Sequence, residues 1–167
     1  GQNINLSTPG AIGLTVTDAF GCVGATSVNV IEHPLVQPNI TGNLSFCDGQ
    51  QTVLDAGTGF VTYQWSNAAA TRNITVNSGG NYSITVTDAN GCVTNGSVSV
   101  IEFPVTAPQI SGDLEFCAGA NVVLTATPGY TSYVWSNSNS GQTNTISQGG
   151  FFSVTATDNN GCTSNNG

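Results

Sequence analysis

Five cysteines are the residues of this 167-residue chain whose types and spacing most directly indicate chemistry. Cys22, Cys92 and Cys162 are spaced 70 residues apart, and Cys47 and Cys117 have the same spacing. No histidine accompanies them at a constant offset, so a zinc site of the usual Cys/His type lacks its second kind of ligand. Cysteines that recur at fixed offsets without histidine partners indicate disulfides formed in an oxidising compartment.

The 70-residue spacing extends to other residues. Trp65 and Trp135 obey it, and so do Asp18, Asp88 and Asp158, which end the TVTD and TATD runs. A fixed period of this length is typical of a tandem array in which each unit is one small module.

The period divides the chain into three segments. We expect residues 1–35 to be the C-terminal part of a repeat, residues 36–105 a complete repeat, and residues 106–167 a repeat lacking its last strand. These limits lead us to expect a parent protein that continues in both directions. Contacts between neighbouring repeats, or covalent links, should help to stabilise units of this size.

Short segments of alternating apolar and polar residues, bounded by Gly, Asn, Asp and Pro, recur along the chain, and none has a helical period. Seven such segments in one repeat predict a β-sandwich with Greek-key connections. The predicted fold class is therefore all-β, with tandem immunoglobulin-like β-sandwich repeats of about 70 residues. In the complete repeat the strands are expected near residues 38–41, 44–47, 51–56, 61–66, 72–76, 81–88 and 95–101.

This topology constrains the cysteine pairing. The strands expected at 51–56 and 81–88 run in the same direction, and Cys47 precedes the first while Cys92 follows the second. Six or seven residues of strand, at about 3.3 Å each, separate the two ends by roughly 20 Å. A disulfide needs Cα atoms about 5.5 Å apart, so a Cys47–Cys92 bond conflicts with the expected topology.

A bond between repeats avoids this conflict. The turn with Cys47 is expected at the C-terminal end of its repeat, facing the loop of the next repeat that contains Cys162. We therefore favour a Cys47–Cys162 bond. The in-repeat pairs Cys47–Cys92 and Cys117–Cys162 are the alternative, because a different strand order would bring them together.

Several motifs occur together in the complete repeat and recur, in part, in the next one. They are Phe46-Cys-Asp-Gly, Val53-Leu-Asp-Ala, Tyr63-Gln-Trp-Ser, Ile74-Thr-Val, Gly80-Asn-Tyr-Ser-Ile-Thr-Val-Thr-Asp and Asn90-Gly-Cys. Together these motifs resemble the Ig-like/PKD-like tandem repeats of large secreted or cell-surface proteins of Bacteroidota, of the gliding-adhesin or filament type. The resemblance implies an extracellular location and a structural or adhesive role.

The aromatic residues have two interpretations. Trp65 and Trp135, each two residues after a tyrosine, could stack against sugars, or they could form the core. An immunoglobulin-like sandwich buries one tryptophan on its third strand, and period-2 alternation places Tyr63 and Tyr133 on the same face. We therefore assign all four residues to the core.

Carboxylates that recur could bind calcium, which takes six to eight oxygen ligands. The candidates are Asp18, Asp88, Asp158, Glu32 and Glu102. The aspartates and the glutamates stand at opposite ends of the expected final strand, so turn formation is the favoured role for the aspartates. Apart from this weak calcium candidate, no metal or cofactor is predicted.

Composition excludes several functions. Arg72 is the only basic residue besides His33, and the net charge is −8, so nucleic-acid binding through Lys/Arg clusters is excluded. No apolar run is long enough to insert into a membrane. His33 is replaced by Phe103 one repeat later, and the sequence has no nucleophile elbow, no phosphate-binding glycine loop and no carboxylate pair that recurs at facing positions, so we expect no catalytic residues and no enzyme.

We interpret the chain as a structural repeat segment of a long extracellular stalk, adhesin or filament, secreted or at the cell surface. Disulfides and linkers that each contain two prolines, Pro34 with Pro38 and Pro104 with Pro108, would stiffen it. Its partners would be neighbouring repeats and other copies of itself in a filament. The alternative is a carbohydrate-binding module array with a glycan ligand, or an accessory region of a secreted hydrolase. Exposure of Trp65 or Trp135 would favour the sugar binder.

Overall fold

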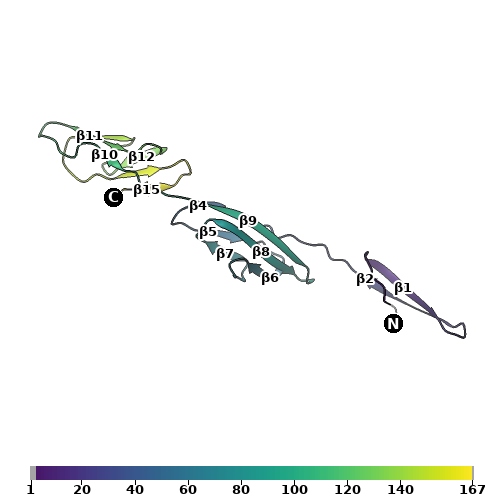
Figure 1. The fold of residues 1–167 in the computed structure, drawn as a ribbon. Helices are drawn as coiled ribbons and strands as arrows, with labels where there is room; N and C mark the ends of the chain where they lie inside the picture. Colours follow the sequence, from purple (N-terminus) through teal and green to yellow (C-terminus); the bar gives the residue numbers. More distant parts are fainter. Residues whose placement is uncertain (1–2, 167) are drawn as a thin grey trace.

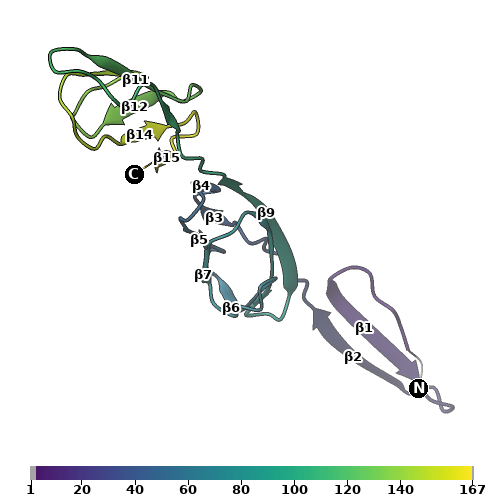
Figure 2. The same cartoon turned by 60° about the vertical axis from the view of Figure 1, so that its left-hand side comes forward.

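The computed structural model describes residues 3–166. Its elements are strands, and the described part of the chain contains no helix, hence none that could cross a membrane. Figures 1 and 2 show three bodies that follow one another along a line: a two-stranded hairpin at the N-terminal end, then a middle and a C-terminal sandwich. The elongated shape leaves contacts only between neighbours.

The middle sandwich confirms the all-β sandwich prediction. Its β4 strand runs parallel to the end of β9, while β8 and β9 form a long antiparallel hairpin. One sheet has the order β3-β5-β7 and the other β4-β9-β8-β6. The strands are β3 (Thr41–Gly42), β4 (Ser45–Cys47), β5 (Thr52–Asp55), β6 (Phe60–Trp65), β7 (Asn73–Val76), β8 (Gly80–Asp88) and β9 (Val93–Phe103).

Alternation along the strands builds the core of this sandwich. In β5 the Leu54 side chain is fully buried, whereas its neighbour Val53 is half exposed. In β8 the inward residues Ile84 and Val86 pack against the opposite sheet. Each such aliphatic side chain contributes roughly 1.5–3 kcal/mol through removal of apolar surface from water.

The C-terminal sandwich repeats this plan around a second core that contains Leu124, Trp135 and Val154. Its last strand is represented by three residues, β15, which pair with β14. The sheet orders are β10-β11-β13 and β12-β14-β15. The strands are β10 (Ile110–Ser111), β11 (Val122–Ala126), β12 (Ser132–Trp135), β13 (Thr143–Ile146), β14 (Val154–Thr157) and β15 (Thr163–Asn165).

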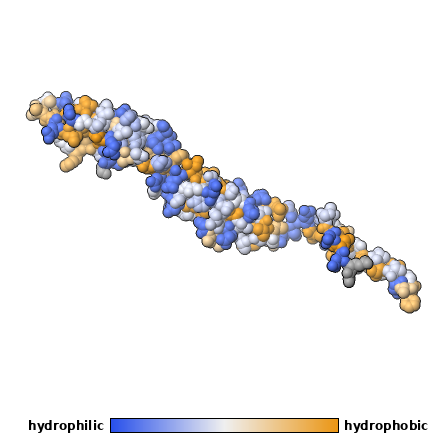
Figure 3. Space-filling view, viewed as in Figure 1, coloured by the Kyte–Doolittle hydropathy of each residue, from blue (hydrophilic) through white to orange (hydrophobic). Residues whose placement is uncertain are grey.

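The N-terminal hairpin pairs β1 (Gly10–Thr17) with β2 (Val23–Val30) in antiparallel register. It corresponds in the 70-residue register to the β8–β9 hairpin. Leu14 is 59% exposed here, whereas its counterpart Ile84 is 1% exposed because a second sheet covers it. The space-filling view shows apolar surface on this end of the molecule (Figure 3). The hairpin therefore has the strand pairing of a sandwich half but no core.

The alternation in β5 gives a matched pair of substitutions. We expect Leu54→Ala to lower the free energy of unfolding of the middle sandwich by about 2–5 kcal/mol, because it leaves a cavity in the core. Val53→Thr keeps a β-branched side chain on the exposed face and should change that free energy by about 0.5 kcal/mol or less. Hydrogen exchange resolved over residues 41–103 measures both, and equal effects would contradict the assigned faces.

Candidate functional site: the junction between the two sandwiches

A disulfide joins the two sandwiches. The Cys47–Cys162 bond has a Cα–Cα distance of 5.6 Å and closes a sequence separation of 115 residues. Cys47 ends β4 of the middle sandwich, and Cys162 immediately precedes β15 of the C-terminal sandwich. Figure 1 shows β4 and β15 meeting where the two bodies adjoin. The structure thus brings together the pair that strand direction favoured.

Strand pairing positions Cys47 at the exit end of the middle sandwich. Cys47 lies opposite Phe103, the last residue of β9, and the Asp48 N–H donates to the Phe103 carbonyl at 2.8 Å. Its neighbour Phe46 is buried in the core and fixes the strand from the other side. The cysteine is therefore held beside the point where the chain leaves for the next sandwich.

A tight turn positions Cys162 at the entry end of the C-terminal sandwich. The Asp158 Oδ1 atom accepts hydrogen bonds from the N–H groups of Cys162 at 2.9 Å and Asn160 at 2.8 Å. Gly161 has a φ of 80°, a left-handed conformation that suits glycine. The Cys162 side chain is buried, and that of Cys47 is partly buried.

The linker between the sandwiches is fixed by hydroxyl groups. The Thr106 carbonyl accepts from the Tyr130 hydroxyl and from the Ser164 hydroxyl, both at 2.7 Å. One linker earlier, the Val36 carbonyl accepts from the Thr94 hydroxyl at 2.6 Å. Thr94 and Ser164 are 70 residues apart, so the two linkers share this contact, which the sequence interpretation missed.

The other cysteines are free thiols in the structure. Cys22 and Cys117 are exposed, and Cys92 is partly buried. The alternative in-repeat pairs, Cys47–Cys92 and Cys117–Cys162, are therefore not formed. Cys92 occupies the turn that corresponds to Cys162, and Cys117 occupies the position that corresponds to Cys47.

Both tryptophans lie in the cores. Trp65 donates from its indole nitrogen to the Thr71 carbonyl and Trp135 to the Gly141 carbonyl, each at 2.9 Å, and neither side chain is exposed. Tyr133 is buried and Tyr63 packs at the edge of the middle core, each with its hydroxyl bonded to a backbone carbonyl. The two tryptophan rings, which we assigned to the core rather than to a sugar-stacking platform, therefore have no free face on the surface.

The recurring aspartates each form a turn. Asp18, Asp88 and Asp158 all accept two backbone N–H groups through one carboxylate oxygen, at 2.8–2.9 Å. The Cys92 N–H bond is the main cause that lowers the pKa of Asp88, and the Cys162 N–H bond does the same for the pKa of Asp158. These hydrogen bonds stabilise the charged form.

The calcium candidates do not converge. Glu102 lies at the far end of β9 from the Asp88 turn and accepts the Gly79 N–H at 2.9 Å. Glu32 lies exposed in the first linker. Over residues 3–166 no group of three or more His, Cys, Asp or Glu side chains is placed to hold a metal ion.

No protein-family model and no curated protein matches the chain. Solved structures with a similar arrangement include an adhesin described as Ca²⁺-stabilised, with which an Antarctic bacterium reaches out and binds ice, at 15% identity and a TM-score of 0.44 over 93% of this chain and 55% of that one. Murine CEACAM1b matches at 12% identity and a TM-score of 0.34, over 72% of this chain and 93% of that one.

A third similar structure is SGBP-B of the Bacteroides ovatus mixed-linkage glucan utilization locus, in complex with a mixed-linkage heptasaccharide. It matches at 14% identity and a TM-score of 0.25, over 92% of this chain and 47% of that one. The chain thus spans about half the length of two of these three structures. Similarity this distant does not bear on what the chain binds or does.

The Asp88 turn predicts a pH dependence of stability. The folded-state pKa is below the unfolded value of about 3.9, so the carboxylate stabilises the fold above that pH and loses its contribution as the pH falls through the folded pKa. We expect Asp88→Asn to lower the free energy of unfolding at neutral pH and to approach the wild-type value near pH 2. Urea unfolding at a series of pH values measures this, with exposed Asp113→Asn as the control. A constant difference between Asp88→Asn and wild type across the series would contradict it.

Proposed function

We propose that the chain is a structural segment of a long extracellular stalk, adhesin or filament, and that it transmits load along its length without catalysing a reaction. The observation that carries this proposal is the Cys47–Cys162 bond, which links the exit of one sandwich to the entry of the next. A covalent bond across a junction restrains bending between the two bodies more firmly than linker hydrogen bonds do.

The bond also changes the path of a pulling force. A load applied at the two ends passes along the chain to Cys47, crosses the sulfur atoms, and leaves from Cys162. The 114 residues of chain between them, 48–161, lie outside this covalent path. Most of the middle sandwich and most of the C-terminal sandwich therefore cannot be extended while the disulfide is intact.

The surface supports a passive extracellular role. Disulfides persist in oxidising compartments, and the composition offers Arg72 as the single Lys/Arg site for trypsin-like proteases. Arg72 is paired with Asp55, so it does not present a free cationic centre for anionic ligands. Solubility rests on Ser, Thr and Asn side chains, which remain polar across a wide pH range.

The sugar-binding alternative depended on exposed tryptophan. Both tryptophans are buried and hydrogen-bonded, which argues against a stacking platform built on them. The stalk interpretation requires these two residues in the core, where they are.

Force measurements test the load path. Chains pulled from both ends should show a total contour length shorter by about 380–410 Å in the oxidised form than after reduction, because a sequence separation of 115 residues, at 3.3–3.6 Å each, is excluded from extension. Cys47→Ser should reproduce the reduced length without reductant. Cys22→Ser, which removes an exposed free thiol, should keep the oxidised length. Equal contour lengths before and after reduction would contradict the proposed role of the bond.

A further inference from the structure

The Cys47–Cys162 bond is not the pairing that chain length favours. Its cysteines are 115 residues apart, whereas Cys22 and Cys47, like Cys92 and Cys117, are 25 residues apart. The chance that the ends of a flexible loop meet falls with about the 3/2 power of the loop length. In an unfolded chain each of the short pairings is therefore favoured by about tenfold. The folded chain must contain something that selects the long-range pair.

The linker between the two sandwiches is short and fixed at both ends. Residues 104–107 connect Phe103, the last residue of β9, to Pro108, whose side chain is fully buried. The next residue, Gln109, is held through its carbonyl, which accepts the Thr127 N–H at 2.8 Å. Because each residue spans at most about 3.6 Å, so short a connection leaves the two sandwiches few relative orientations.

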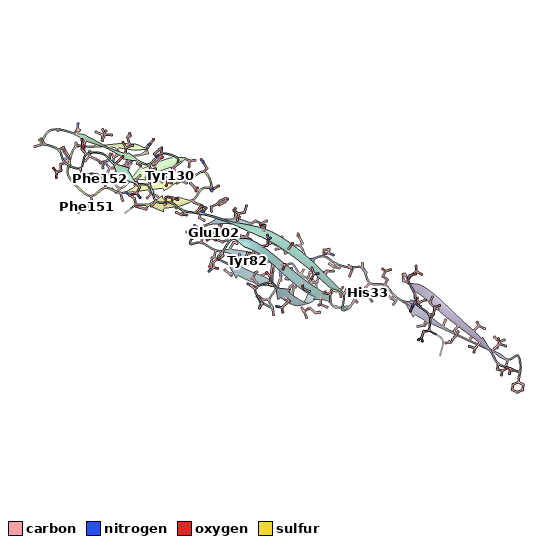
Figure 4. The ribbon with its side chains drawn as sticks, viewed as in Figure 1. His33, Tyr82, Glu102, Tyr130, Phe151 and Phe152 are labelled. Carbon is pink, nitrogen blue, oxygen red and sulfur yellow. A yellow bond between two sulfur atoms is a disulfide. The ribbon has the colours of Figure 1, made fainter. Side chains whose placement is uncertain are left out.

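Two hydroxyl groups bind the middle of this linker. The Thr106 carbonyl accepts the Tyr130 and Ser164 hydroxyls, which come from different parts of the C-terminal sandwich. Figure 4 shows Tyr130 in the part of that sandwich that lies toward the middle sandwich, with Glu102 at the facing end of β9. Ser164 lies in β15, which Cys162 immediately precedes. A residue that holds the linker and a cysteine that forms the bond are thus two positions apart.

The first linker shows that such a contact does not need a disulfide. The Val36 carbonyl accepts the Thr94 hydroxyl at 2.6 Å, although Cys92, two residues before Thr94, is a free thiol. A Cβ atom on Gly96 would lie 2.8 Å from the Pro38 Cγ atom, so this linker also packs closely on β9. Docking of a linker on the sandwich that follows it therefore does not depend on a disulfide.

Tyr130 distinguishes the second linker from the first. In the 70-residue register it corresponds to Phe60, and the two rings pack alike. Tyr130 lies edge-on to Tyr133 with ring centroids 5.8 Å apart, and Phe60 lies edge-on to Tyr63 at 6.0 Å. Because phenylalanine has no hydroxyl, the first linker cannot accept the equivalent hydrogen bond. The linker beside the disulfide therefore has a contact that the first linker lacks.

We propose that the Tyr130 and Ser164 hydroxyls select the Cys47–Cys162 pairing, because they dock the linker and so place the two sandwiches before the disulfide forms. In the docked arrangement the Cα atoms of the two cysteines are 5.6 Å apart, as a disulfide requires. Tyr130 and Ser164 are positioning residues, since neither takes part in the bond. The inference concerns how the junction forms, and it holds whether or not the chain carries load.

Closing the junction is an oxidation. The thiolate of one cysteine attacks a small-molecule disulfide, such as glutathione disulfide, and displaces one glutathione thiol. The second cysteine then attacks the mixed disulfide and displaces the other glutathione thiol. The two cysteines lose two protons and two electrons in total, which the two glutathione thiols take up. Docking acts on the second, intramolecular step, because it raises the effective concentration of one cysteine at the other.

The effective concentration of the pair measures this docking. The chain is equilibrated with reduced and oxidised glutathione, and the oxidised fraction is determined. Tyr130→Phe keeps the ring and removes the hydroxyl, so we expect the effective concentration to fall by about 2- to 10-fold, the net contribution of one hydrogen bond. Ser164→Ala should act in the same direction. Ser164→Thr should keep the wild-type value, because Thr94 makes the same contact in the first linker. The free thiols are removed beforehand by Cys22→Ser, Cys92→Ser and Cys117→Ser.

Thr94→Val is the matched control. It removes the same kind of contact from the first linker, which lies outside the loop that the disulfide closes, and it should leave the effective concentration unchanged. Urea unfolding of the oxidised variants checks that both sandwiches remain folded. An unchanged effective concentration in the chain that carries both Tyr130→Phe and Ser164→Ala would overturn the proposal, and so would an equal loss in Thr94→Val.

The selection itself is tested in the chain with all five cysteines. The reduced chain is oxidised with glutathione disulfide, with and without denaturing urea, and non-reducing peptide mapping identifies the bonds. We expect Cys47–Cys162 in native buffer, and mainly Cys22–Cys47 and Cys92–Cys117 in urea. Predominance of Cys47–Cys162 in urea as well would show that no docked arrangement is needed and would refute the proposal. Neither result alters the contour length expected of the oxidised chain, so the force measurement is judged separately.

Discussion

The direction of the strands at the two ends of each sandwich is the constraint on which the rest of the structure depends. Because β4 runs parallel to the end of β9, Cys47 and the exit of the chain lie at one end of the middle sandwich. The turn after β14 places Cys162 at the entry end of the next sandwich. A disulfide that closes more than 100 residues stabilises by about 4.7 kcal/mol in the chain-entropy account, against about 1 kcal/mol for each linker hydrogen bond.

Much of this could be predicted from the sequence, because the decisive signals are local or repeat. Alternation in β5 and β8 gave the buried faces, and the length of one strand was enough to disfavour a Cys47–Cys92 bond. The hydroxyl contacts of Thr94 and Ser164 could not be foreseen. They join side chains to carbonyls 58 residues away, and hydroxyl residues are so frequent here that a repeated Thr or Ser carries little information.

Whether a residue of the repeat is buried also depends on which strands cover it, and this differs between the hairpins. Val16 and Val86 occupy the same place in the register, yet Val16 is 56% exposed and Val86 is fully buried. The difference arises because the strands that carry Leu54, Trp65 and Ile74 cover one hairpin and nothing in the described residues covers the other.

The same geometry connects the edge of the sheet with the stiffness of the junction. A sandwich whose last strand leads straight into the linker must complete its sheet with residues adjacent to the next module, so the sheet edge and the junction are one structure. The pairing of β4 with the end of β9 extends to Phe103. The Phe103 carbonyl accepts the Asp48 N–H and so helps to position Cys47. The pairing of β4 with β9 and the Cys47–Cys162 bond are therefore parts of one junction, in which the sheet places the cysteine and the disulfide links it to the next sandwich.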